Sequence, residues 1–481
     1  MICITVAPES RTLAPADLLN ASRQCDLIEL CLDHFIHEPN VSELIKSVDK
    51  PIVVSCRRER DGGRWTGSEA ERMQRLKTAI VAGPAYVELD VEMAEQIPRF
   101  GHTKRVVAYT SLSRPVSKID EILSRCCNAS ADLVKFTWLT EDLDGAWPLL
   151  AAVTQPRELP IVGIGYGLSG ITFSLLSRKY GSPWIYAALE RGTEAIAQQA
   201  TVWQLNEDYR CGEINRQTRF AGVIGCGETE NITARVFNAA FAAMGKRIRC
   251  LPLLPGDHSK FAKMLEKMKI NGLVVAPGYD GDLAPVAAKL DQMAMVSGRI
   301  DVMQKLSDGW RGICTTFAAL EQAGIEVTGR TEWLSVGTVT VIGNSVMAQG
   351  AAKFISGRGA AVSIAGPSDN AAAKIARTVG VRHVNWNAVH DLKSDVLVFA
   401  DRGTTCGPAK GQINPTLIHE RSILVDLTVP LRGSAFAEEA VARGAIYIHP
   451  AKVFANQLKL QFRHLTGREL SEDFLTQEFA K

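Results

Sequence analysis

The segment Ala131-Asp132-Leu133-Val134-Lys135-Phe136-Thr137 places a single lysine inside a short apolar run. Branched and aromatic residues in a run of this length predict a buried β-strand. Seven similar runs surround it, separated by segments with the apolar spacing of helices. The eight predicted strands are 1–6, 27–32, 52–55, 86–91, 105–110, 133–137, 161–165 and 184–187. Eight strands that alternate with helices predict a parallel (β/α)8 barrel over residues 1–205.

Polar residues at the carboxyl ends of these strands are the candidates for chemistry, because functional side chains of such barrels gather at that end. They are Glu29, Asp33, Arg57, Arg58, Glu88, Asp90, Thr110, Ser111, Lys135 and Tyr166. We expect Lys135 to point into the barrel mouth. Desolvation lowers the pKa of an ammonium group and favours the neutral amine, which forms a Schiff base with a ketone. The alternative is a structural ion pair of Lys135 with Glu29 or Asp90.

The rest of the chain predicts a different α/β architecture. The polar run Asn206-Glu207-Asp208-Tyr209-Arg210 predicts a linker over 206–219. A smaller α/β lobe is expected over 220–330. The apolar run at 338–343 opens a doubly wound sheet of dinucleotide-binding (Rossmann) type over 331–455. Residues 456–481 are expected to form a helix that returns to the smaller lobe.

Composition excludes several classes of protein. The 481 residues carry 54 Lys+Arg against 52 Asp+Glu, so net charge gives no argument for binding nucleic acid or an acidic membrane. No apolar run reaches the roughly 18 residues of a membrane helix, and the chain begins as a strand rather than a signal peptide. The eleven cysteines lack the paired spacing of a zinc site, so no metal is predicted. We expect a cytoplasmic protein that acts on a small molecule; its oligomeric state is left open.

Four motifs in the first half occur in the order known from one enzyme family. They are IELCLD (28–33), SCRRERDGG (55–63), DLVK (132–135) and GTEAIAQQ (192–199). Residues 1–205 resemble type I 3-dehydroquinate dehydratase on these motifs. The resemblance implies dehydration of 3-dehydroquinate to 3-dehydroshikimate through a Schiff base on Lys135. It also implies that Glu29, Arg57 and Gln199 contact the substrate.

Some family positions have changed. Cys31 stands where the family has an arginine, and Thr110 stands where it has its catalytic histidine. A missing general base typically costs about 10²–10⁴-fold in rate. If the barrel is instead a lysine-imine enzyme for another small keto acid, water or Tyr109 is the expected proton relay. Ser174 stands at a further arginine position, with Arg178 one helical turn away as a candidate replacement.

The second half resembles shikimate dehydrogenase over about residues 220–470. The resemblance rests on GVIG (222–225), FNAAF (237–241) and QLKLQFRHLTG (457–467). It implies substrate contacts at Asn231, Thr233 and Gln457. It also implies NADP contacts in the loop GNSVMA (343–348), at Gly343, Ser345 and Val346. A dehydratase followed by a dehydrogenase is the order of bifunctional shikimate-pathway fusions.

The second half has also lost groups that the dehydrogenase reaction needs. The segment VVAPGYD (274–280) lacks the family's catalytic lysine, and Thr316 stands in the place of its aspartate partner. Ser345 adds a Cβ where the backbone must approach a pyrophosphate. The segment AGPS (365–368) has no arginine for a 2′-phosphate, and Asp369 is either a ribose contact or a turn residue. We therefore expect a weak or inactive dehydrogenase.

Three hypotheses follow. The first is a bifunctional shikimate-pathway enzyme in which the dehydratase half carries the activity. The second is a catalytically degenerate regulatory or scaffolding protein that binds a quinate- or shikimate-like acid or a partner. The third is a lysine-imine enzyme for another small keto acid.

Overall fold

A computed structural model describes residues 1–114, 116, 118–279, 283–335, 337–401, 413–428, 431–432 and 435–480. The chain folds into two compact units. The first comprises Met1–Cys226 with Ala234–Lys269, and the second comprises Gly227–Thr233 with Ile270–Lys481.

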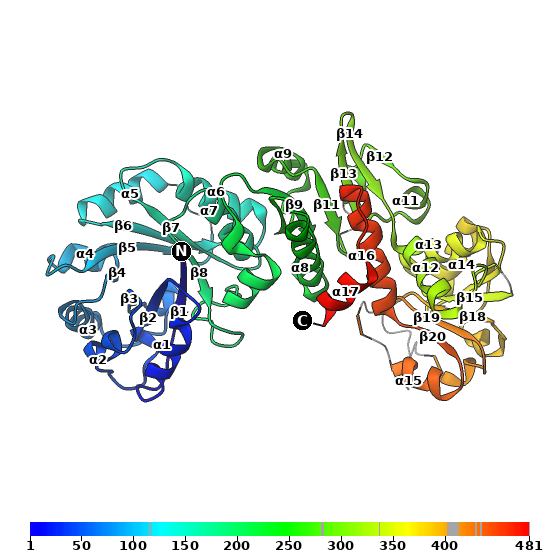
Figure 1. The fold of residues 1–481 in the computed structure, drawn as a ribbon, viewed down its shortest axis with the longest axis horizontal. Helices are drawn as coiled ribbons and strands as arrows, with labels where there is room; N and C mark the ends of the chain where they lie inside the picture. Colours follow the sequence, from blue (N-terminus) through cyan, green and yellow to red (C-terminus); the bar gives the residue numbers. More distant parts are fainter. Residues whose placement is uncertain are drawn as a thin grey trace. The chain divides into compact units, whose positions relative to one another are not determined.

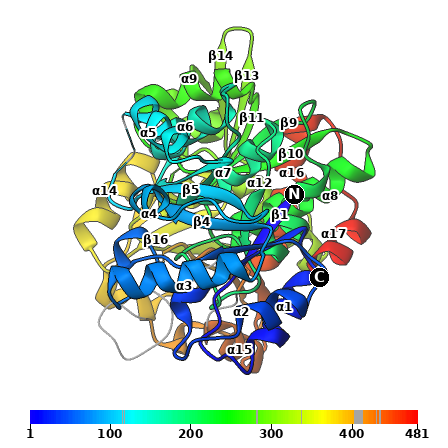
Figure 2. The same ribbon diagram turned by 90° about the vertical axis from the view of Figure 1, so that its left-hand side faces the viewer.

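The first unit contains eight parallel strands in the order β7-β6-β5-β4-β3-β2-β1-β8, and β7 also contacts β8 to complete the ring (Figure 1). The strands are β1 (Ile2–Val6), β2 (Leu27–Cys31), β3 (Ile52–Ser55), β4 (Tyr86–Asp90), β5 (Lys104–Ser111), β6 (Leu133–Leu139), β7 (Ile161–Tyr166) and β8 (Ile185–Ala188). Figure 2 shows β4 and β5 side by side in this unit. The predicted (β/α)8 barrel is confirmed.

Helices alternate with these strands. They are α1 (Ala14–Ser22), α2 (Val41–Lys46), α3 (Glu69–Val81), α4 (Val91–Gln96), α5 (Ile119–Asn128), α6 (Leu143–Thr154) and α7 (Gly170–Lys179), with the 3₁₀ turns η1 (Leu32–His34) and η2 (Glu59–Asp61). Local sequence sets their ends. Ser68 and Glu71 form a reciprocal capping box at the start of α3, and the Asp142 side chain caps α6.

Residues 206–219, which the sequence predicts as a linker, pack into the first unit. They contribute the end of a π-helical turn, η3 (Gln204–Asp208), and the turn η4 (Cys211–Glu213), and Asp208 and Tyr209 are buried. The paired strands β9 (Arg219–Ile224) and β10 (Ile248–Leu253) follow, with α8 (Glu228–Ala243) and α9 (His258–Met268). Thr172 donates to the carbonyl of Pro252 at 2.6 Å, so β10 is anchored to α7. The unit therefore extends beyond the expected boundary at residue 220.

The second unit contains two groups of strands. The first runs β11-β13-β14-β12, and the second is a parallel sheet in the order β17-β16-β15-β18-β19-β20. The strands are β11 (Gly272–Val275), β12 (Lys289–Leu290), β13 (Val302–Leu306), β14 (Gly309–Ile313), β15 (Thr338–Ile342), β16 (Ala361–Ala365), β17 (Arg382–His383), β18 (Val396–Phe399), β19 (Ile423–Asp426) and β20 (Ile446–Ile448). In order along the chain, the parallel sheet reads 3-2-1-4-5-6, the strand order of a Rossmann fold. The predicted doubly wound sheet is confirmed.

The helices of this unit are α11 (Gln292–Ser297), α12 (Thr316–Thr328), α13 (Val346–Ser356), α14 (Asp369–Val379), α15 (Ala435–Ala442), α16 (Pro450–Thr466) and α17 (Glu472–Phe479). The turns are η5 (Ala284–Val286), η6 (Trp386–Asp391) and η7 (Pro415–Leu417). Helix α16 packs on α12, β11 and β13, so the chain returns to the smaller lobe at its end. Among the described residues, no helix is long and apolar enough to cross a lipid bilayer.

Candidate functional site

Lys135 lies inside the barrel, in a layer of side chains from the even-numbered strands. Glu29 on β2, Glu88 on β4 and Tyr186 on β8 complete this layer, as alternate strands do in a barrel core. The Nζ atom of Lys135 lies 2.6 Å from Glu88 Oε2 and 3.5 Å from Glu29 Oε1. It also lies 4.5 Å from the centre of the Tyr186 ring. Lys135 is only 1% exposed, so the amine faces the barrel interior.

Arg57 adds a second cation to this cluster. It follows β3, and its backbone amide donates to Asp33 at 3.1 Å. Its guanidinium donates to Glu29 at 2.8 Å and to the Cys31 sulfur at 3.2 Å, and it lies 3.8 Å from Glu88. Two buried cations thus face two buried carboxylates, and the structure brings Lys135, Glu29 and Arg57 together as the motifs imply.

The two carboxyl groups differ in acidity. Burial by itself raises a carboxyl pKa, but Arg57 and Lys135 outweigh it and lower the pKa of Glu29 to about 2. Burial raises the pKa of Glu88 above its usual range, and the Lys135 ammonium offsets only part of that effect. Glu88 is therefore the better proton acceptor of the two near neutral pH. The sequence motifs gave Glu88 no role. A signal was present, however, because Glu29, Glu88 and Lys135 are each the third residue of their strands.

Gln199 lies next to this layer. Its Oε1 accepts a hydrogen bond from Thr5 at 3.0 Å, and Thr5 is paired in register with Glu29. Its Nε2 is buried and has no hydrogen-bond partner within the described part of the chain. A buried, unpaired amide donor costs free energy unless a ligand or water satisfies it.

The barrel mouth holds a cavity of about 20 Å³, roughly the space of one water molecule. Arg57, Glu88 and Thr110 line it, so the cavity reaches the carboxylate that pairs with Lys135. Thr110, at the family's histidine position, therefore does face the same space as Glu88.

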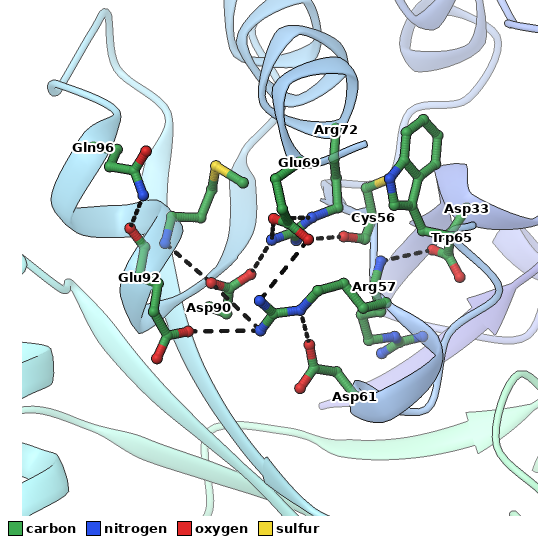
Figure 3. Close-up of polar contacts among 12 residues, drawn as sticks. Asp33, Cys56, Arg57, Asp61, Trp65, Glu69, Arg72, Asp90, Glu92 and Gln96 are labelled. Atoms are coloured by element: carbon green, nitrogen blue, oxygen red, sulfur yellow. Dashed lines mark hydrogen bonds and ion pairs between the residues drawn. The ribbon is translucent and has the colours of Figure 1, made fainter. Parts of the chain in front are cut away.

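Two further arginines near the mouth cavity are held in ion pairs. Arg58 pairs with Asp61 at 2.5 Å, and Arg72 pairs with Asp90 at 2.6 Å. Figure 3 shows this network around Asp90. Asp90 thus pairs with arginines and not with Lys135, contrary to one of the two ion pairs considered from the sequence.

Arg178 does not face the barrel mouth. Burial, and after it the charge of Arg178, lowers the pKa of the Met1 amino group, so Arg178 lies near the start of β1. Ser174 donates to the Gly170 carbonyl within its own helix. The proposed replacement of the missing arginine by Arg178 has no support in this geometry, because it lies at the opposite end of the strands.

The second unit contains a cavity of about 710 Å³ between its two groups of strands. Gln457 lines it and donates to Thr316 at 3.0 Å and to Asp301 at 3.2 Å. Asp301 is buried and also accepts from the backbone amides of Thr315 and Thr316. No sequence motif singled out this carboxylate, which lies beside the position where the family has its aspartate.

The cavity is lined from the start of α8 by Glu228, Thr229 and Glu230. Thr233 is buried, and its hydroxyl donates to the Thr229 carbonyl within the helix at 2.7 Å. The predicted substrate contacts at Asn231 and Thr233 stay predictions. Pro277 and Gly278 line the cavity where the lysine loop is expected, and Asp280 lies outside the described residues.

The loop between β15 and α13 tests whether a dinucleotide fits. Gly343 has a φ of +152°, Ser345 caps α13, and Val346 is the exposed first residue of that helix. The backbone amides of Asn344 and Ser345 both donate to the carboxylate of Asp401. These amides are the groups that hold a pyrophosphate in a Rossmann fold. In this structure both amides are therefore used by the Asp401 carboxylate.

Asp369 is the first residue of α14 in this structure. Its carboxylate accepts from the Trp386 amide at 2.8 Å and from Asn385 at 3.0 Å. Among the described residues, no cluster of three or more His, Cys, Asp or Glu is arranged to hold a metal ion.

Fold and site together define a two-part α/β protein. Its first part is a (β/α)8 barrel with a buried lysine–carboxylate cluster, and its second part contains a Rossmann-type sheet. Residues 2–216 match the family model described as type I 3-dehydroquinase.

Curated relatives extend the match to the whole chain. The bifunctional 3-dehydroquinate dehydratase/shikimate dehydrogenase of Arabidopsis thaliana, described as chloroplastic, is 21% identical over 95% of this chain and 80% of its own length. A 3-dehydroquinate dehydratase of Dehalococcoides mccartyi is 28% identical over 41% of this chain and 91% of its own length. The dehydroquinate dehydratase and shikimate dehydrogenase structure from S. pombe AroM covers 100% of this chain and 98% of its own, at 16% identity and a TM-score of 0.45. The family match of the first half and the Arabidopsis relative, which spans both halves, agree with the organisation of a bifunctional shikimate-pathway protein that the sequence motifs implied.

Proposed function

We propose that the barrel dehydrates 3-dehydroquinate to 3-dehydroshikimate through an imine on Lys135, with Glu88 as the group that exchanges protons with the amine. The observation that carries this proposal is the buried 2.6 Å contact between Lys135 Nζ and Glu88 Oε2. A carboxylate with a raised pKa beside an ammonium can accept its proton and release the nucleophilic amine.

The chemistry follows from the residue types. The neutral amine adds to the substrate ketone, and loss of water gives an iminium ion on Lys135. The iminium acidifies the neighbouring C–H bond, so a base removes that proton and the adjacent hydroxyl leaves as water. A further water hydrolyses the imine and restores Lys135. Glu88 pairs with Lys135 and also lines the mouth cavity. It can therefore act as the base, which the hydroxyl of Thr110 cannot do.

The substrate contacts are proposed on the same cluster. Gln199 offers its unpaired Nε2 to a substrate oxygen. Glu29 is held as a carboxylate by Arg57 and is an acceptor for a substrate hydroxyl. Arg57 is the buried guanidinium nearest to this layer and is proposed to receive the substrate carboxylate.

Reductive trapping tests the imine. The full chain is treated with 3-dehydroquinate and borohydride, and its intact mass is measured. The wild type and a control variant, Lys104→Ala at the exposed start of β5, are expected to gain one covalent adduct. Lys135→Ala is expected to gain none. A folded wild type without an adduct, or an adduct that survives in Lys135→Ala, contradicts the proposal.

The role of Glu88 needs a separate variant. Glu88→Gln keeps the side-chain shape but cannot accept the lysine proton, so we expect the dehydration rate to fall about 10²-fold or more. The absorbance of the conjugated product measures this rate. An unchanged rate assigns the proton transfer to another group.

A second candidate function is ligand binding without turnover. It is favoured by the mouth cavity of about 20 Å³, which is too small for a six-membered cyclic acid, and by the ion pairs that Lys135 and Arg57 already form with Glu88 and Glu29. Calorimetric titration with quinate and 3-dehydroquinate distinguishes the two functions. Saturable binding with neither adduct nor absorbing product supports a regulatory or scaffolding role.

A further inference from the structure

Asp401 lies at the point in the Rossmann-type sheet where a dinucleotide ligand is normally bound. The strands β15 and β18 are neighbours. The chain continues from β15 to β16 on one side and from β18 to β19 on the other. The carboxyl ends of β15 and β18 are therefore the topological switch point of the sheet. Gly343 follows β15 directly. Asp401 follows β18 after one intervening alanine, so the two loops face each other at this crevice.

The carboxylate of Asp401 takes the hydrogen bonds that a phosphate takes at such a loop. Its Oδ2 accepts from the backbone amides of Asn344 and Ser345, the latter at 3.1 Å. Its Oδ1 accepts from the Ser345 hydroxyl. The amides belong to the amino-terminal end of α13, where the helix dipole also favours a negative charge.

Asp401 also occupies the space next to Gly343. A Cβ added to Gly343 would come within 2.7 Å of the Asp401 carboxylate. The close approach that the first glycine of the fingerprint normally offers to a pyrophosphate is thus used by a side chain of the same protein.

We propose that Asp401 is a built-in anionic occupant of this loop and that its carboxylate excludes the diphosphate group of dinucleotides from the second unit. Three effects act together. An incoming diphosphate must displace a group held on the same chain, must compete for amide donors that are already used, and meets a like charge at contact distance. This obstacle to a dinucleotide comes from a residue outside the nucleotide fingerprint, and it adds to the Cβ of Ser345.

The test measures dinucleotide binding by the full chain. Fluorescence titrations with NADPH and NADH compare the wild type with Asp401→Asn, which keeps the shape and removes the charge, and with Asp401→Ala, which also empties the cradle. Asp395→Asn is the matched control, because Asp395 immediately precedes the same strand and accepts from the Thr338 amide at 2.7 Å at the other end of it. Near-ultraviolet circular dichroism verifies that each variant is folded.

We expect no saturable binding by the wild type and the control at millimolar dinucleotide. Asp401→Ala is expected to bind at least tenfold more tightly, with ADP competing for the same site. The gain for Asp401→Asn is expected to be smaller. Wild-type binding as tight as that of the variants overturns the proposal. The proposal is also overturned if Asp401→Asn and Asp401→Ala both fold but bind neither the dinucleotides nor ADP. If Asp401→Ala does not fold, the proposal is tested by comparing the dinucleotide affinities of Asp401→Asn and Asp395→Asn. Equal affinities overturn it.

Discussion

Glu29 and Glu88 face the same ammonium group, and their surroundings give them opposite tasks. Glu29 lies 2.8 Å from Arg57 as well as close to Lys135, so two cations hold it as a fixed negative charge. Glu88 lies 2.6 Å from Lys135 but 3.8 Å from Arg57, and burial dominates its pKa. Paired carboxyl groups with separated pKa values are the usual way in which a site divides acid–base work.

Glu29 gives a prediction for stability. A carboxyl group whose pKa falls on folding stabilises the native state at neutral pH, and this contribution is lost as the pH falls through about 4 toward the folded value of about 2. Glu29→Gln leaves two buried cations short of a partner and is expected to cost about 3 kcal/mol at pH 7. The difference from wild type should shrink as the pH is lowered toward 3.5.

Urea unfolding at several pH values measures this difference. Glu9→Gln is the control, because the Glu9–Arg64 pair is exposed and is expected to contribute less than about 1 kcal/mol. Equal costs for the two substitutions would show that the buried cluster does not depend on Glu29.

At the scale of elements, the contact between β7 and α7 shows how closely the barrel layers pack. Gly165 lies on β7 and Gly170 begins α7. A Cβ on Gly170 would come within 2.3 Å of the Gly165 carbonyl oxygen, which is backbone and cannot rotate away. The helix can therefore sit this close to the strand only because both positions lack a side chain.

Gly170→Ala is expected to destabilise the barrel by about 1–3 kcal/mol, the usual cost of overpacking. Gly212→Ala is the matched control, since a Cβ there meets no atom within 4 Å. Thermal unfolding of both variants checks the prediction. A melting temperature for Gly170→Ala equal to that of the control would mean that α7 moves without cost.

At the scale of the whole molecule, buried carboxyl groups set how stability changes with pH. Burial raises the pKa of Asp208 to about 7, against a weaker opposing effect of Arg235. The native state then binds a proton that the unfolded chain releases between about pH 4 and 7. This contribution declines as the pH rises across that range, whereas that of Glu29 grows as the pH rises from about 2 to 4.

Asp208→Asn removes the cost of a buried charge, so it is expected to stabilise the protein by about 2–4 kcal/mol at pH 8 and to have little effect at pH 4. Unfolding free energies at the two pH values provide the measurement. A stabilisation that is the same at pH 4 and pH 8 would exclude titration of Asp208 as its origin.

Local sequence was enough to predict the eight barrel strands and the Rossmann-type sheet, and to point to Lys135, Glu29 and Arg57. Each of these depends on local information: apolar runs of strand length, helical spacing and short motifs whose residues lie next to one another in the chain. The predicted strand at 133–137, for example, lies within the observed β6 (Leu133–Leu139).

Which groups meet in space depends on the folded chain. Glu88 reaches Lys135 because the barrel closes with both strands in one layer, and Asp401 reaches the Ser345 loop from 56 residues further along the chain. Arg178 is one helical turn from the expected position in sequence but faces the start of β1. Such contacts depend on the register and order of strands that are distant in sequence, and no local pattern of residues encodes them.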